Sequence, residues 1–175
     1  MKRKGPKTFE CDACAIAKAK RVIRREPKDF IRAPGAQIAV DFFDFETGID
    51  RKNSLVLFTD RYSGYVWDYY LSDRKQKSLQ DVFRGFFAKL RNFFEIKPKK
   101  IECDEELDKH ENLMKWLKEE GVQVDLTAPH TQAQDGAAES SGRVVVKTAT
   151  AMRVSANLPH KLWSEVTKAA VYLLN

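Results

Sequence analysis

The order of hydrophobic segments in this 175-residue chain predicts an α/β domain with five strands and flanking helices. Two observations carry the prediction. Three short apolar segments follow one another in the first half of the chain with only short turns between them, which is typical of an antiparallel meander. Beyond them, segments with helical periodicity alternate with short strand-like segments, as in α/β folds.

Three strands are predicted first. Ile38–Phe45 opens with an apolar run, Ser54–Thr59 is almost continuously apolar, as in a buried strand, and Tyr65–Leu71 is rich in aromatic residues. Gly48–Asn53 and Asp60–Gly64 have the composition of turns. Turns this short bring consecutive strands into antiparallel pairs.

The clearest helix is predicted for Ser78–Phe94, where apolar residues recur at helical spacing. Its apolar face consists of Leu79, Val82, Phe83, Phe86, Phe87, Leu90, Phe93 and Phe94. We expect this row of side chains to form core rather than to bind a ligand. Pro98 ends the segment, because proline does not fit a helix interior.

Strands and helices alternate after Pro98. Lys100–Cys103 is a predicted strand that leads into Asp104, and Lys109–Glu120 is a predicted helix. Val122–Leu126 is a predicted fifth strand. The order of elements up to this point is β-β-β-α-β-α-β.

Two further helices are predicted near the end of the chain. After a polar loop that contains Pro129, a helix is expected from Asp135–Gly136 to about Arg153, since an Asp oxygen can cap free backbone N–H groups at a helix start. An amphipathic helix from about Lys161 to Leu174 follows.

Three acidic residues lie on or directly after predicted strands or at the start of a predicted helix. Asp41 lies on the first predicted strand, Asp104 follows the fourth, and Glu139 lies in the first turns of the next-to-last helix, with 34 residues between Asp104 and Glu139. A carboxylate displayed after an ordered loop can bind a metal ion. The alternative for Glu139 is a surface ion pair with Arg143, four residues further on the same helix face.

This pattern resembles the integrase core of Ty1/copia-type retrotransposons, a family related to retroviral integrases. That family has an Asp on the first strand, an Asp at the end of a later strand and a Glu on the following helix. The loop before the Glu commonly reads Thr-Pro-x-x-Asn-Gly-x-x-Glu. Here Thr131–Glu139 matches the Gly and the Glu in spacing, whereas Gln132 and Asp135 depart from the Pro and the Asn. The resemblance covers the chain from about Cys11 to Asn175.

The resemblance implies a ribonuclease-H-like fold, with a mixed five-stranded sheet in which the first strand lies beside the fourth. It also implies a DDE-type integrase, which is a nucleotidyltransferase and endonuclease. Such an enzyme nicks element DNA near a 3′ end and then joins the freed end to target DNA. Two Mg²⁺ or Mn²⁺ ions would take part, bridged by Asp41 and held by Asp104 and Glu139, one each.

DNA is therefore the expected partner, with RNA as an alternative, and a homo-oligomer is expected by analogy with the family. Arg143 lies one turn after Glu139 and Lys147 one turn further, so both would face the DNA. The alternative for both is a solvated side of the helix. The family analogy also predicts a nuclear location.

Positive charge is concentrated at the start of the chain. Residues 1–37 hold 11 Lys and Arg against 4 Asp and Glu, whereas the remainder holds 20 against 21. Lys20, Arg21, Arg24 and Arg25 are expected to bind DNA phosphates without sequence preference. A solubilising tail and a nuclear-import signal are the alternatives. We divide the chain into a basic N-terminal arm, residues 1–30, and an integrase catalytic core, residues 31–175.

Cys11 and Cys14 form a Cys-x-x-Cys pair in this arm. The family's N-terminal zinc module has two His residues before such a pair, but His110, His130 and His160 all follow it here. A structural zinc site uses four ligands, so this half-site would hold Zn²⁺ weakly and zinc is not expected. The resemblance therefore predicts a chain shortened at both ends, without the full zinc module and without the family's C-terminal DNA-binding region.

Composition argues against other classes of protein. Apolar residues make up 43% of the chain, but no apolar run approaches the roughly 20 residues that span a bilayer, so no membrane partner is expected. The N-terminus has no apolar signal core, and three Cys residues fit reduced thiols inside the cell. Two alternative functions remain open: a catalytically decayed nucleic-acid-binding remnant, and a nuclease of the ribonuclease H or resolvase type.

Overall fold

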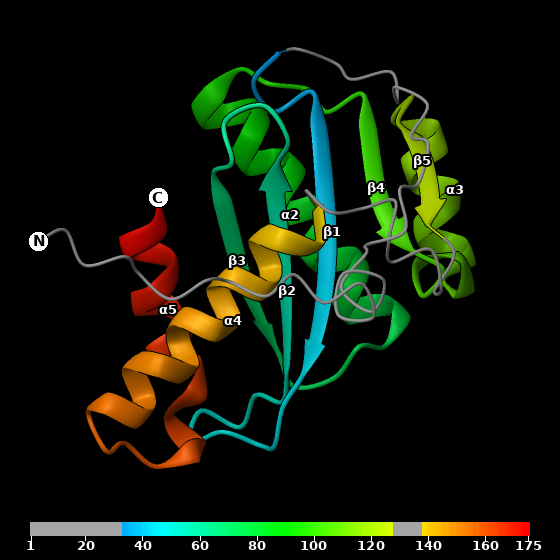
Figure 1. Cartoon of the computed structure of the whole chain (residues 1–175). Coiled ribbons are helices and arrows are strands. Elements are labelled where there is room, and N and C mark those ends of the chain that lie inside the picture. The colour runs from blue at the N-terminus through cyan, green and yellow to red at the C-terminus, as the bar shows by residue number, and fades with distance from the viewer. Residues whose placement is uncertain (1–32, 128–137) are drawn as a thin grey trace, which may run out of the picture.

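A five-stranded sheet forms the middle layer of the protein (Figure 1). Its strands are β1 (Gln37–Asp44), β2 (Ser54–Asp60), β3 (Val66–Leu71), β4 (Lys100–Asp104) and β5 (Gln123–Thr127). In the computed structural model, which describes residues 33–127 and 138–175, they lie in the order β3-β2-β1-β4-β5. The predicted position of the first strand beside the fourth is confirmed.

The sheet is mixed. β2 pairs antiparallel with both β1 and β3, whereas β4 pairs in parallel with both β1 and β5. The antiparallel half follows from the short turns of the meander. The parallel half requires crossover connections, which the helices after β3 and β4 supply.

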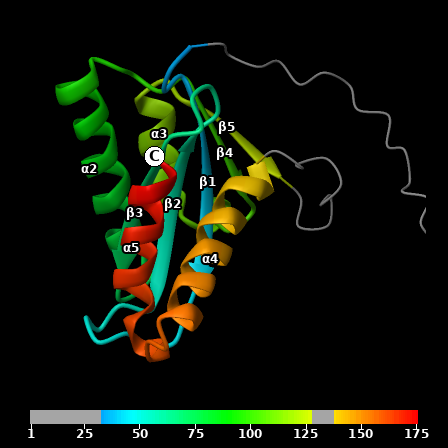
Figure 2. The same cartoon turned by 60° about the vertical axis from the view of Figure 1, so that its left-hand side comes forward.

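Helices cover both faces of the sheet (Figure 2). The helices α2 (Gln76–Phe94) and α3 (Glu111–Glu119) pack on one face, and α4 (Ala138–Ser155) and α5 (Trp163–Leu174) pack on the other. The predicted order of strands and helices is confirmed. Two short 3₁₀ segments, which were not predicted, precede α3 and α5 at Leu107–Lys109 and His160–Leu162.

The larger core lies between the sheet and α2, because alternate residues of β1 such as Ile38 and Val40 point to that face. Most of the predicted apolar row of α2 is buried there, and Leu90 is its last buried residue. The prediction was wrong for Phe93 and Phe94, which are 79% and 49% exposed. Helical periodicity identifies the apolar face of a helix, but it does not say where along the helix the covering sheet ends.

The smaller core lies under α4 and α5. Leu55 and Leu57 of β2 meet Val145 of α4 and Trp163 of α5. The Trp163 ring stacks on Phe45 with 4.2 Å between centroids, and its indole N–H donates to the Glu46 carbonyl. These contacts fix both helices against the face of the sheet that carries Asp41. Within the two described ranges, no helix is long and apolar enough to cross a membrane.

Candidate active site

The ends of β1 and β4 bring two aspartates together. The parallel ladder pairs Gln37 with Lys100 and Ala39 with Glu102. Continuing this register by two residues sets Asp41 beside Asp104, on strands about 4.8 Å apart. Asp41 is half-buried in the central strand, and Asp104 is exposed as the last residue of β4.

Helix α4 approaches Asp41 at Gly142. A Cβ atom on Gly142 would lie 2.8 Å from Asp41 Oδ2 and 3.0 Å from Phe43 Cζ. Glu139 precedes Gly142 by three residues within α4, so both positions lie on the same helix face. The Glu139 side chain itself lies outside the described part of the chain. The backbone thus carries position 139 on the helix face that meets the strand of Asp41.

Asp104 has two hydrogen-bond donors among the described residues. Its Oδ1 accepts from the Glu106 backbone N–H at 3.1 Å and from the Cys103 thiol at 3.7 Å. Burial raises the pKa of Cys103 well above its ordinary range, and the carboxylates of Asp104 and Asp41 add to the rise. Cys103 is a buried free cysteine. The effect of both aspartates on one thiol agrees with their placement by the strand register.

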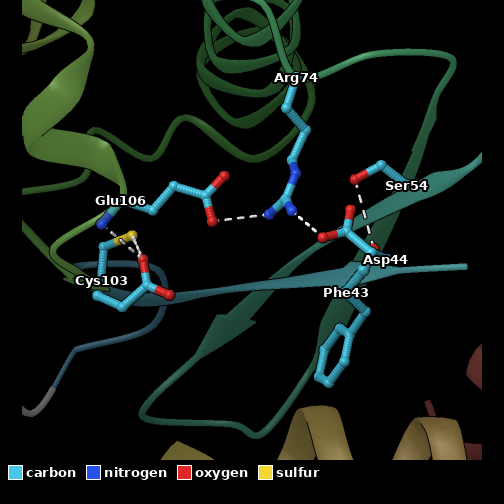
Figure 3. A network of polar contacts seen from close by, with 7 residues as sticks. Phe43, Asp44, Ser54, Arg74, Cys103 and Glu106 are labelled. Carbon is cyan, nitrogen blue, oxygen red and sulfur yellow. Dashed lines mark hydrogen bonds and ion pairs between the residues drawn. The ribbon is translucent and has the colours of Figure 1, made fainter. Parts of the chain in front are cut away.

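Arg74 joins two other acids at this end of the sheet (Figure 3). It lies in the segment between β3 and α2, and its guanidinium pairs with Asp44 at the end of β1 and with Glu106 Oε2, at 2.7 Å, just after β4. Burial raises the pKa of Glu106; the Arg74 guanidinium opposes the rise, and the Asp104 and Asp44 carboxylates add to it. The Glu106 carboxylate, two residues after Asp104, is therefore held in an ion pair with Arg74.

The residues at this end of the sheet fit a magnesium-type ion. Mg²⁺ prefers oxygen ligands and keeps several of its waters, so a few carboxylates are enough to hold it. Asp41 and Asp104 supply such oxygens, and the absence of a side chain at Gly142 allows α4 to come close to Asp41 Oδ2. Within residues 33–127 and 138–175, no group of three or more His, Cys, Asp or Glu forms a complete metal site.

The predicted DNA-binding residues fall in two parts of the chain. Arg143 and Lys147 are exposed on α4, just after Gly142. The basic residues Lys20, Arg21, Arg24 and Arg25 and the pair Cys11 and Cys14 lie outside the described residues. So do Gln132 and Asp135 of the loop before α4.

The chain was compared with known proteins. No family model matches the chain. The chain is 25% identical over 170 residues to the retrovirus-related Pol polyprotein from transposon RE2 of Arabidopsis thaliana, and 26% identical over 121 residues to the transposon Ty1-DR4 Gag-Pol polyprotein of Saccharomyces cerevisiae. These matches cover 97% and 69% of this chain but 12% and 8% of the relatives, so the chain spans about a tenth of their length.

Solved structures show the fold. The HTLV-2 integrase catalytic core domain in complex with magnesium aligns with a TM-score of 0.57 at 15% identity, over 81% of this chain and 87% of that one. The catalytic core domain of BIV integrase aligns with a TM-score of 0.55 at 13% identity, over 81% and 84%. This chain is similar in sequence to stretches of these transposon Pol polyproteins, and it has the fold of an integrase catalytic core. The predicted ribonuclease-H-like fold is thereby confirmed.

Two residues at this end of the sheet were not found from the sequence. Gly142 carried a usable signal, because a glycine in a helix interior often marks a close approach to another element. Arg74 carried none, since it is one of several charged residues in a polar loop. Its role depends on pairing with residues 30 positions before it and 32 after it.

Proposed function

We propose that this chain is the catalytic core of a Ty1/copia-type retrotransposon integrase. It nicks element DNA near its 3′ ends and joins the freed ends to target DNA. The observation that carries the proposal is the approach of α4 to Asp41 at Gly142, beside a second aspartate on the neighbouring parallel strand. The relationship to Pol polyproteins supports it.

In this proposal Asp41, Asp104 and Glu139 hold two Mg²⁺ or Mn²⁺ ions. When bound, such a pair supplies charge stabilisation for both the attacking and the leaving oxygen of an in-line displacement. Asp41 belongs to the central strand, whose backbone is paired with β2 on one side and β4 on the other, so its position is fixed. The Glu106 N–H orients the Asp104 carboxylate through Oδ1.

Exposed cations beside these residues would bind the DNA backbone. Arg143 and Lys147 follow Glu139 on α4 and would contact phosphates near the reacting strand. Lys20, Arg21, Arg24 and Arg25 would add contacts that do not depend on sequence. Two element ends must meet at one target, so we also propose a homo-oligomer that works in the nucleus. A related structure, of a simian T-cell lymphotropic virus, is described as an intasome.

Strand cleavage and joining on a labelled branched DNA, with Mg²⁺ or Mn²⁺, tests the proposal. We expect products from the parent chain and none from Asp41→Asn, from Glu139→Gln or in the presence of a chelator. A folded, DNA-binding parent that yields no product with either ion contradicts the proposal and favours a decayed remnant. Loss of the RNA strand of an RNA–DNA hybrid as the main reaction favours a ribonuclease H instead.

The basic arm has its own test. Removing residues 1–30 should weaken DNA binding and flatten its dependence on salt, because each lost phosphate contact lowers the slope of log K against log salt by about 0.9. Binding isotherms at several salt concentrations measure this slope. Equal slopes for the full chain and the shortened chain would show that the arm does not bind DNA.

A further inference from the structure

The backbone ladder between β1 and β4 stops before it reaches the two aspartates. The last pair of the ladder is Ala39 with Glu102, whereas Asp41 and Asp104 each lie two residues further on. Two carboxylates on neighbouring strands repel each other when no cation lies between them. Contacts outside the ladder can therefore stabilise this end of the strand pair.

Arg74 is a cation that connects the two strand ends (Figure 3). One of its terminal nitrogens pairs with Asp44, the last residue of β1, and the other lies 2.7 Å from Glu106 Oε2. The guanidinium also lies 5.7 Å from the centroid of the Phe42 ring, and its side chain is 21% exposed. A planar, two-sided donor in a partly buried position is suited to hold two carboxylates in a defined geometry.

The two ion pairs of Arg74 are connected to Asp41 and Asp104 through short stretches of backbone. Glu106, which Arg74 holds by its carboxylate, donates its own backbone N–H to Asp104 Oδ1 at 3.1 Å. Asp44, which Arg74 holds on the other side, is three residues after Asp41 on the same strand. A displacement of Arg74 would therefore free the turn that orients Asp104 relative to β1.

We propose that Arg74 is a positioning residue for the metal-binding carboxylates of this chain. It ties the end of β1 to the turn after β4 and so maintains the separation of Asp41 and Asp104. It also keeps Asp44 and Glu106 engaged, so that they do not compete for the ion. This inference rests on the proposed function, because it presumes that Asp41 and Asp104 bind metal.

The direction in which the affinity for a divalent cation changes, when Arg74 is substituted, distinguishes a positioning role from a simple effect of its charge. Removal of a nearby positive charge, by Coulomb's law alone, strengthens the binding of a divalent cation. Loss of a residue that orients metal ligands weakens it, typically by roughly 10- to 100-fold. The two explanations thus predict opposite changes in affinity for the same substitution.

The experiment is a Mn²⁺ titration of the full chain, followed by electron paramagnetic resonance of the free ion. The variants are Arg74→Gln, Arg74→Lys and Asp104→Asn, with Arg91→Gln as the matched control. Arg91 lies near the other end of α2 in an exposed ion pair with Glu120, so its substitution removes the same charge and the same kind of contact. Circular dichroism and urea unfolding check the fold of each variant.

We expect Arg74→Gln to bind Mn²⁺ roughly 10-fold more weakly than the parent. The Mn²⁺ affinity of Arg74→Lys should lie between those of Arg74→Gln and the parent, because an ammonium group cannot bridge two carboxylates as a planar guanidinium does. Arg91→Gln should bind like the parent. Strand joining at saturating Mn²⁺ should recover in part for Arg74→Gln, since a weakened site can still be filled.

A folded Arg74→Gln that binds Mn²⁺ as tightly as the parent, or more tightly, overturns the inference. Should Arg74→Gln not fold, Arg74→Lys decides, and parental affinity in that variant overturns the inference as well. If Asp104→Asn weakens Mn²⁺ binding but Arg74→Gln does not, the inference about Arg74 fails and the proposed function is unaffected. A parent that binds no Mn²⁺, with or without DNA, overturns the proposed function and this inference together.

Discussion

Two aspartates end the strands on either side of β1, and their surroundings differ. Asp60 ends β2 and is 2% exposed, and its carboxylate accepts from the backbone N–H of Gly35 at 2.9 Å and from the N–H and hydroxyl of Ser63 at 3.1 and 2.6 Å. Asp104 ends β4 and is exposed, and its described donors are the Glu106 N–H and the Cys103 thiol.

The difference follows from strand direction. β2 runs antiparallel to β1, so Asp60 lies opposite Ile38 near the start of β1. β4 runs parallel to β1, so Asp104 lies near Asp41 instead. An aspartate whose oxygens are all engaged by donors serves the fold, whereas one that retains free acceptor capacity beside another acid can serve chemistry. The same substitution at the two positions should therefore have opposite consequences.

Asp104→Asn tests whether Asp104 serves the reaction, and it has the largest expected effect. Strand cleavage and joining should fall by more than about 100-fold, because a metal ligand supports several kcal/mol of transition-state stabilisation. The free energy of unfolding should stay within about 0.5 kcal/mol of the parent value, since the amide oxygen can still accept from Glu106. Product assays and urea unfolding measure the two quantities. Retained activity would remove Asp104 from the site.

Asp60→Asn tests whether Asp60 stabilises the fold. We expect a loss of about 3 kcal/mol in the free energy of unfolding, because the amide NH₂ would face buried donors that the carboxylate now satisfies. Urea unfolding measures this loss, and Mn²⁺ affinity of the folded fraction should not change. A variant as stable as the parent would show that the hydrogen bonds of this turn contribute little.

Gly142→Ala should disturb the surroundings of Asp41 without affecting the turn that holds Asp60. The added methyl group would clash with Asp41 Oδ2 and Phe43, which should cost about 2 kcal/mol of stability and at least about tenfold in activity. Gly85→Ala on α2 is the matched control, since a Cβ atom there meets nothing within 4 Å. That control should gain about 0.5–1 kcal/mol from helix propensity. Equal behaviour of the two variants would contradict the close approach of α4.

Tyr70→Phe gives the smallest expected effect and concerns a third strand acid. The Tyr70 hydroxyl donates to Asp68 Oδ2 at 2.7 Å, and burial, followed by this hydrogen bond and the charge of Asp68, raises the pKa of Tyr70. The folded state therefore keeps its proton while the unfolded state loses it above about pH 10, so stability falls as pH rises. The loss should be less than about 1 kcal/mol half a unit above that pH.

Urea unfolding below and above about pH 10 should show a smaller pH dependence for Tyr70→Phe than for the parent. The same dependence in both proteins would assign it to other groups. Either result leaves the contrast between Asp60 and Asp104 in place, because Asp68 already has a hydroxyl donor and lies on the far edge strand.

Much of the fold could be predicted from local patterns. The apolar run that opens β1, the continuous apolar run of β2 and the helical spacing of α2 are each visible within one segment, because apolar side chains must be buried when the element packs. Predicted and observed element boundaries coincide or differ by at most three residues, and the 3₁₀ segments before α3 and α5 were missed. The exposure of Phe93 depends on where the sheet ends, which no local pattern records.

For the candidate site, too, some features could be predicted from the sequence and others depend on the tertiary structure. The sequence by itself determined which acids lie at strand ends and which helix follows, because side-chain type and spacing are local properties. Only the tertiary structure decided that α4 meets Asp41 at Gly142, that Asp60 is enclosed by backbone donors, and that Arg74 joins Asp44 to Glu106. The physical reason is that an ion pair or a close contact needs two groups within a few ångströms, and strand order and direction, not sequence separation, set that distance.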